Sequence, residues 1–165
     1  MQFAKASNVK KPKQLSVVAA SLYLAGFFTI AAVLQLFAFE SYPGVIQSYG
    51  LPFADGFALP LAALVVVLEV FAIPYLLWMK LSPPMRLVSM ISGWLALAYW
   101  LGVGIWQGIV DFTIANAGLF GAKLLMPQGR WLVCYCAVLL ILMIYVVWNM
   151  PPSVLRKKPL AKPTH

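Results

Sequence analysis

Residues 57–79 read FALPLAALVVVLEVFAIPYLLWM, and Glu69 is the one residue among them that is Asp, Glu, Lys, Arg or His. As a helix, this run is long enough to cross about 30 Å of hydrocarbon, which needs roughly 20 residues. Its apolar residues are continuous rather than alternating, and backbone groups in lipid must find hydrogen-bond partners within their own segment. The segment therefore predicts a transmembrane helix and excludes a barrel strand.

The composition extends this interpretation to the whole chain. Of its 165 residues, 63% are hydrophobic and 10% are charged, whereas a soluble domain has about 45–50% apolar and 25% charged residues. This composition excludes a soluble enzyme. Three further apolar runs of spanning length predict helices at about 15–39, 87–106 and 131–149. We expect an all-α membrane protein, a four-transmembrane-helix bundle, with the lipid bilayer as its surroundings.

The chain divides into a basic tail at 1–14, a membrane domain at 15–149 and a Pro- and Lys-rich tail at 150–165. The apolar core of the first span is too long for a signal peptide, and no small-residue cleavage pattern precedes Glu40. We expect this span to remain as a signal anchor in a multi-pass protein.

The basic residues predict the orientation of the bundle. Ten of the twelve Lys and Arg residues lie in the two tails and in the short connection between the second and third spans. Because such residues favour the cytoplasmic side, we expect both termini and this connection in the cytoplasm. The net charge of +8 is thereby explained as a topology signal, and we expect no nucleic-acid partner.

Glu69 is the candidate polar site within the membrane. A charged carboxylate at this depth costs several kcal/mol, and no Lys, Arg or His lies within the spans at this level, so we expect Glu69 to be protonated. Thr29 and Tyr99 fall at a similar depth and are its expected partners, while Pro74 frees a backbone carbonyl nearby. Two interpretations stay open: a hydrogen bond that holds the helices together, or a proton relay, quinone contact or substrate contact.

A family resemblance rests on residues outside the spans as well as within them. The segment between the third and fourth spans contains, in order, Asn116, Ala117, Gly118, Leu119, Phe120 and Gly121. It accompanies Tyr42-Pro43-Gly44, Tyr49-Gly50-Leu51-Pro52 and Leu68-Glu69. With the four-span plan, these residues resemble the methylamine-utilisation protein family MauE, within the DoxX-like membrane superfamily, over residues 15–149.

The chain departs from that family at its cysteines. Typical MauE-like members carry a Cys-Gly-Cys-Phe-Gly motif on the outer side, which suits thiol–disulfide exchange. Here Ala117 and Leu119 occupy the two cysteine positions. The resemblance therefore implies an accessory protein of the bacterial inner membrane without its own thiol chemistry. Its implied role is processing, transport or maturation of a periplasmic partner, such as a methylamine dehydrogenase subunit or a thioredoxin-like protein.

The DoxX-like resemblance also allows an alternative, a quinone-linked membrane subunit of an oxidoreductase. Glu69, Tyr99 and Trp100 would then line a quinone site, and otherwise we expect no cofactor. The two cysteines, Cys134 and Cys136, are two residues apart on a helix and point about 200° away from each other, so we expect packing residues and no mutual disulfide. Exchange of either thiol with a partner's disulfide stays an alternative. One His and two unsuited Cys predict no metal site.

Overall fold

The computed structural model describes residues 11–50, 54–110, 118–121 and 130–149. These residues form helices and turns. The helices are α1 (Lys11–Phe37), α2 (Tyr42–Gln47), α3 (Ala54–Leu76), α4 (Pro83–Val110) and α5 (Arg130–Asn149). Four of them, α1, α3, α4 and α5, contain segments long and apolar enough to cross a membrane. The predicted all-α, four-span bundle is confirmed.

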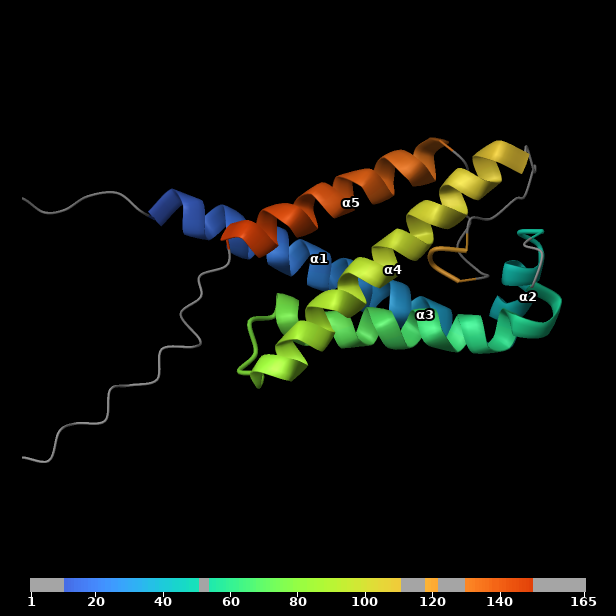
Figure 1. The fold of residues 1–165 in the computed structure, drawn as a ribbon, viewed down its shortest axis with the longest axis horizontal. Helices are drawn as coiled ribbons and strands as arrows, with labels where there is room; N and C mark the ends of the chain where they lie inside the picture. Colours follow the sequence, from blue (N-terminus) through green and yellow to red (C-terminus); the bar gives the residue numbers. More distant parts are fainter. Residues whose placement is uncertain (1–10, 51–53, 111–117, 122–129, 150–165) are drawn as a thin grey trace, which may run out of the picture.

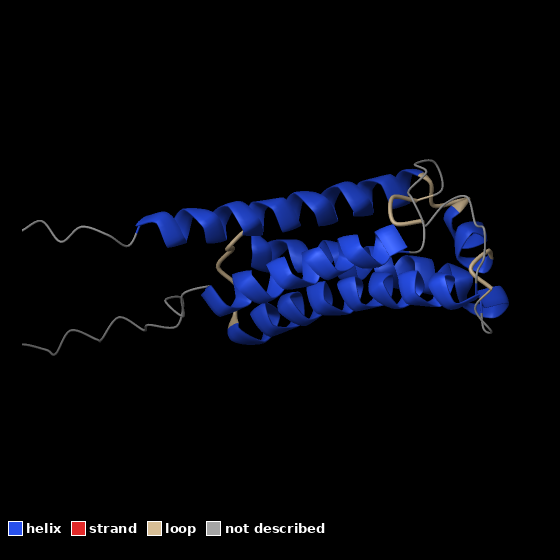
Figure 2. Cartoon of the chain, turned by 90° about the horizontal axis from the view of Figure 1, so that it is seen from above, coloured by secondary structure: helices blue, strands red, loops and turns tan. Residues whose placement is uncertain are grey.

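The four long helices lie side by side along the long axis of the molecule (Figures 1 and 2). In the bundle α1 packs against α3, α3 against α4, α4 against α5, and α5 against α1. One end holds the start of α1, the α3–α4 connection and the end of α5, and we name it the basic end (Figure 1). The other end holds α2, which packs against α3, and we name it the α2 end.

The helix bounds differ from the predicted spans by one to four residues at every end except the last, and an extra short helix is present. The third span was expected at 87–106, but α4 begins at Pro83 and ends at Val110. Proline is well suited to the first turn of a helix, because the N–H that it lacks would have no partner there. The short helix α2 was not expected at all, since its Tyr42-Pro43-Gly44 start indicated only a turn. Pro43 again lies in the first turn, where its restricted φ favours a helix start.

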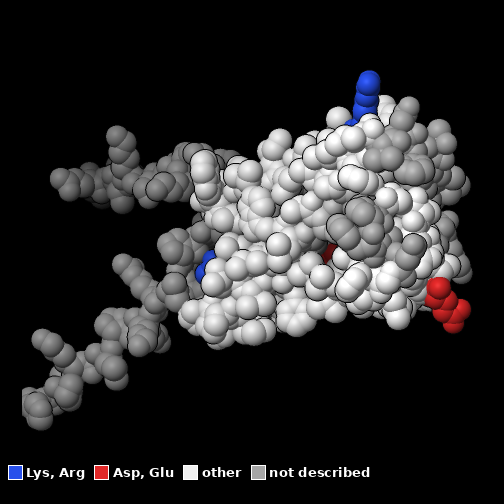
Figure 3. Space-filling model, turned by 45° about the vertical axis from the view of Figure 1, so that its right-hand side comes forward, with Lys and Arg blue, Asp and Glu red and all other residues white. Residues whose placement is uncertain are grey.

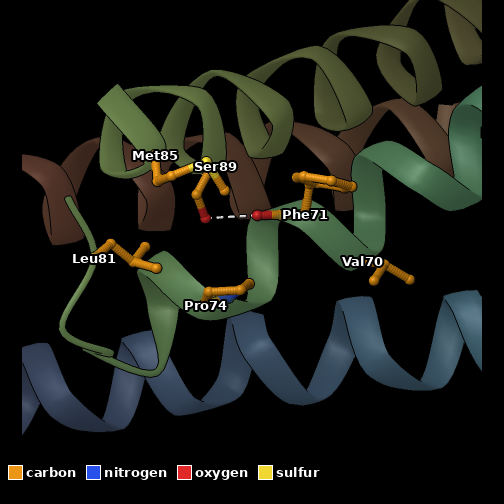
Figure 4. A pocket seen from close by; sticks show the side chains of 6 residues that line it. All are labelled: Val70, Phe71, Pro74, Leu81, Met85 and Ser89. Atoms are coloured by element: carbon orange, nitrogen blue, oxygen red, sulfur yellow. Dashed lines mark hydrogen bonds between the residues drawn. The ribbon is translucent and has the colours of Figure 1, made fainter. Parts of the chain in front are cut away.

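Pro74 interrupts α3, and a side chain from α4 repairs the break. The Ser89 hydroxyl donates a hydrogen bond to the Phe71 carbonyl and accepts one from the Tyr75 N–H at 3.0 Å. It therefore stands between two backbone groups that would pair with each other in a regular helix. Figure 4 shows Ser89 against this stretch of α3, beside Pro74. The proline thus creates a polar contact that fastens α3 to α4.

The surface of the bundle is apolar along its flanks. Large side chains such as Leu22, Ile30, Leu64 and Ile141 are more than half exposed. On the face shown in Figure 3, the charged side chains that protrude lie toward the ends, and between them only a small acidic patch is visible, deep in a hollow. Such an extended apolar surface requires a lipid bilayer around it. The chain is therefore a multi-pass integral membrane protein.

Candidate functional site

The Glu69 carboxyl is the centre of a buried polar site. Glu69 lies on α3 and has no exposed surface. Its Oε1 atom accepts a hydrogen bond from Gln35 Nε2 at 3.1 Å and another from Trp100 Nε1 at 2.9 Å. Gln35 belongs to α1 and Trp100 to α4, so three of the four long helices meet at one carboxyl oxygen.

Gln35 connects this carboxyl to the turn at 118–121. Its Nε2 atom also donates to the Leu119 carbonyl at 3.0 Å, and both residues are fully buried. The turn is closed by a hydrogen bond of 2.9 Å from the Gly121 N–H to the Gly118 carbonyl. Both glycines have positive φ angles, +74° and +75°, which residues with a Cβ rarely adopt.

The same turn packs closely against α1 and the residues that follow α2. A Cβ atom on Gly118 would collide with the Tyr49 hydroxyl, and one on Gly121 would come within 2.9 Å of the Leu34 carbonyl oxygen. The Phe120 ring makes an edge contact with Phe27 of α1. The turn is therefore a fitted part of the α2 end rather than a loose connection.

Two phenols are buried at the α2 end, and one of them, Tyr42, lies near the carboxyl. Tyr42 and Tyr49 are both fully buried. Burial raises the pKa of the Tyr42 phenol well above its usual value, and the nearby Tyr49, Tyr99 and Glu69 groups raise it further. This electrostatic influence places the four groups in one neighbourhood. We use the name Glu69 cluster for a set of five residues: Gln35, Tyr42, Glu69, Tyr99 and Trp100.

The Glu69 cluster contains polar atoms that have no hydrogen-bond partner within the described part of the chain. These buried atoms are Gln35 Oε1, Tyr42 Oη, Glu69 Oε2 and Tyr99 Oη. A buried polar atom without a partner costs about 1–3 kcal/mol, and native proteins contain few of them. Four in one cluster make this the place in the described chain where most hydrogen-bonding capacity is left unused.

The structure corrects one expected partner of Glu69 and modifies another. Thr29 is wrong as a partner, because its side chain is exposed and its hydroxyl donates to the Ala25 carbonyl of its own helix at 2.8 Å. Thr29 and Gln35 are six residues apart on α1, so they point to different sides. The Tyr99 hydroxyl is buried in the cluster but makes no hydrogen bond with the carboxyl.

Sequence reasoning missed Gln35 altogether and did not find the hydrogen bond from Trp100. Gln35 is the one amide side chain within the predicted span 15–39, and polar residues in a span usually face the bundle interior. That rule was applied only to ionisable groups. Trp100 was named in the quinone alternative, but nothing in its position along the chain indicated that its indole N–H would reach Glu69.

The structure describes both cysteines but only part of the motif at 116–121. Cys134 is exposed and Cys136 is buried, and both are free thiols in the structure. Neither belongs to the turn at 118–121. Asn116 and Ala117 lie outside the described residues. Among the residues that are described, no group of three His, Cys, Asp or Glu side chains could hold a metal ion.

The fold and the site together define a class of protein, a four-span membrane bundle with a buried polar cluster at one carboxyl. Comparison of the chain with protein-family models, with curated proteins and with solved structures gives no match.

Proposed function

We propose that this protein is an accessory protein of the bacterial inner membrane, resembling MauE, that serves a partner on the periplasmic side. The partner is a protein such as a methylamine dehydrogenase subunit or a thioredoxin-like protein. The bundle supports processing, transport or maturation of this partner and performs no thiol exchange of its own, because Ala117 and Leu119 stand where the family has its cysteines.

One observation carries this proposal, the anchoring of the turn at 118–121. Hydrogen bonds connect the Leu119 carbonyl to Gln35 and Gln35 to Glu69, so the turn is held from within the membrane. A turn that is fixed in this way loses little conformational entropy when a partner docks on it. Of this turn, Phe120 is partly exposed, so we infer that a partner at the α2 end contacts it there, while the buried Gly118, Leu119 and Gly121 hold it in place.

The test is purification of the tagged protein from its own host in a gentle detergent, with quantitative mass spectrometry of the proteins that accompany it. We expect a periplasmic protein at near-stoichiometric amount. Gly121→Val strains the turn and should reduce the amount of co-purified partner severalfold. Gly44→Ala is the matched control, because a Cβ at this glycine of α2 meets nothing within 4 Å.

A second variant covers the case in which Gly121→Val does not fold. Gln35→Met keeps a side chain of similar length but removes the amide that holds Leu119 and Glu69. It should therefore also reduce the amount of partner that co-purifies. The proposal is overturned if no periplasmic protein accompanies the wild type, or if Gly121→Val and Gln35→Met retain as much partner as the wild type does.

The unpartnered atoms of the Glu69 cluster favour a second candidate, a quinone-linked membrane subunit of an oxidoreductase. A quinone ring presents two oxygens that accept hydrogen bonds when oxidised and donate them when reduced. The Tyr42 and Tyr99 hydroxyls and Glu69 Oε2 can serve either state, provided that Glu69 is protonated. The aromatic ring of Trp100 supplies an apolar wall for such a ring.

Quinone content separates the second candidate from the first. A lipid extract of the gently purified protein should contain about one quinone per chain, and Glu69→Gln should lose it. Glu40→Gln is the control, because this carboxyl is exposed on the chain between α1 and α2. A quinone-free wild type, or equal quinone in Glu69→Gln, excludes the second candidate and leaves the first intact.

A further inference from the structure

A second candidate site lies at the basic end, far along the bundle from Glu69. A cleft of about 390 Å³ opens where the α3–α4 connection and the start of α4 meet the end of α5. This volume is within the range of about 300–1,000 Å³ that is typical of small-ligand pockets. We name it the Arg86 cleft, and its main lining residues are Tyr75, Leu81, Arg86, Leu87, Met90 and Val147.

The Arg86 side chain is held in a defined place at this cleft. Its guanidinium carbon lies 5.6 Å from the centroid of the Tyr75 ring, a cation–π arrangement. Tyr75 is itself only 4% exposed, so the ring that supports the guanidinium is part of the bundle core. A cation that is positioned in advance loses less side-chain entropy when it binds an anion.

Among the described residues, no acidic side chain lies beside Arg86 at the basic end. Glu40 and Asp55 flank α2, Glu69 lies in the middle of α3, and Asp111 follows the last residue of α4, at the far end of that helix from Arg86. These four residues are all the acids of the chain. The positive charge at the cleft is therefore uncompensated by any acidic side chain nearby, which favours an anionic ligand from outside the chain.

The remaining walls of the cleft select the kind of anion. Leu81, Leu87, Met90 and Val147 provide apolar surface from three segments of the fold, directly beside the cation. A small water-soluble anion would leave this surface uncovered, whereas an amphiphile covers it with hydrocarbon and places its charge on Arg86. Arg86 is also within the first turn of α4, one turn from the end of the span, at the depth expected for lipid headgroups.

We propose that the Arg86 cleft binds one anionic phospholipid of the leaflet at the basic end. The phosphate accepts hydrogen bonds from the Arg86 guanidinium, whose planar fork matches two phosphate oxygens. An acyl chain lies along Leu87, Met90 and Val147 and so joins α4 to α5 through the lipid. This inference does not depend on the Glu69 cluster or on the proposed function.

The test uses the full-length protein, delipidated in a mild detergent and titrated with phosphatidylglycerol or with phosphatidylcholine of the same acyl chains. Native mass spectrometry counts the lipids bound to each protein molecule. We expect phosphatidylglycerol to bind about tenfold more tightly than phosphatidylcholine, because the choline ammonium of phosphatidylcholine offsets the charge of its phosphate beside Arg86, whereas the glycerol headgroup leaves that charge uncompensated. Equal binding of the two lipids overturns the proposal.

Two charge variants decide whether Arg86 is the residue responsible. Arg86→Gln should weaken phosphatidylglycerol binding about tenfold and phosphatidylcholine binding by less, so that the preference for phosphatidylglycerol is lost. Lys80→Gln is the matched control, because Lys80 is an exposed cation of the same end that does not line the cleft, and its removal should change binding by about twofold at most. Full binding by Arg86→Gln, or an equal loss in Lys80→Gln, overturns the proposal.

A variant that fills the cleft tests the contribution of its apolar walls. This variant also replaces Arg86→Gln as the test if Arg86→Gln fails to fold. Met90→Trp keeps Arg86 but fills the space beside it, so it should lose phosphatidylglycerol and phosphatidylcholine alike. Retention of phosphatidylglycerol by this variant overturns the proposal. So does displacement of the bound lipid by inorganic phosphate at equal concentration, since the site would then recognise the phosphate without the acyl chains.

Discussion

The Glu69 carboxyl shows how one polar residue organises three helices. One of its oxygens accepts hydrogen bonds from Gln35 and Trp100, while the other has no partner among the described residues. In lipid, a hydrogen bond between helices adds modestly to stability, about 0.6 kcal/mol on average. The cluster is thus better suited to setting the register of the helices than to holding the bundle together.

Tyr42 provides a prediction at this scale. Its hydroxyl is buried without a partner within the described chain, so Tyr42→Phe should leave the free energy of unfolding within about 0.5 kcal/mol of wild type at pH 7, or raise it. Chemical unfolding in detergent micelles measures this difference. A loss of more than about 2 kcal/mol would show that the hydroxyl has a partner.

The same phenol predicts a pH dependence. Because the folded-state pKa of Tyr42 is raised, its contribution to stability is fully present below the unfolded pKa of about 10 and is lost as the pH rises through the folded value. Between about pH 10 and pH 11, the unfolded phenol loses its proton while the buried one keeps it. The melting temperature of wild type should therefore fall more steeply over this interval than that of Tyr42→Phe. Parallel curves for wild type and Tyr42→Phe would refute this prediction.

At the scale of the elements, α3 depends on its neighbours for continuity. Pro74 leaves the local helix ladder open, and Ser89 of α4 closes it through the Phe71 carbonyl and the Tyr75 N–H. At the end of α3, the Ser21 hydroxyl of α1 donates to the Leu76 carbonyl and accepts from the Trp78 indole at 3.1 Å. Two serines from different helices therefore satisfy backbone groups that α3 cannot satisfy itself.

Ser89→Ala tests this dependence. Removing the hydroxyl leaves the Tyr75 N–H without its partner, so the free energy of unfolding should fall by about 1–3 kcal/mol. Ser92→Ala is the matched control, because the Ser92 hydroxyl only bonds to the Val88 carbonyl of its own helix at 2.9 Å. Its effect should stay within about 0.5 kcal/mol. Equal stability of the two variants in detergent would show that the bridge contributes nothing.

At the scale of the whole molecule, the two ends of the bundle differ. The α2 end carries a short helix, the turn at 118–121 and the Glu69 cluster beneath them. The basic end carries the α3–α4 connection and the Arg86 cleft. The proposed partner and the proposed lipid would therefore bind at opposite membrane surfaces, which requires one fixed orientation of the bundle.

Reporter fusions test that orientation. A green fluorescent protein fused after His165 should fluoresce and an alkaline phosphatase fused there should be inactive, because the excess of Lys and Arg predicts a cytoplasmic C-terminus. A phosphatase inserted after the exposed Ser48, at the α2 end, should be active. The reverse pattern would invert the orientation and move the proposed partner to the cytoplasm.

The sequence by itself determined the class of the protein, because the length and continuity of its four apolar runs allow no other way to satisfy the backbone in lipid. It also indicated Glu69, since a carboxyl within a span is conspicuous whatever surrounds it. Only the tertiary structure decided that Gln35 and Trp100, rather than Thr29, reach this carboxyl. Depth along a span can be counted from the sequence, but the side of each helix that faces the carboxyl depends on how the helices rotate and pack against one another.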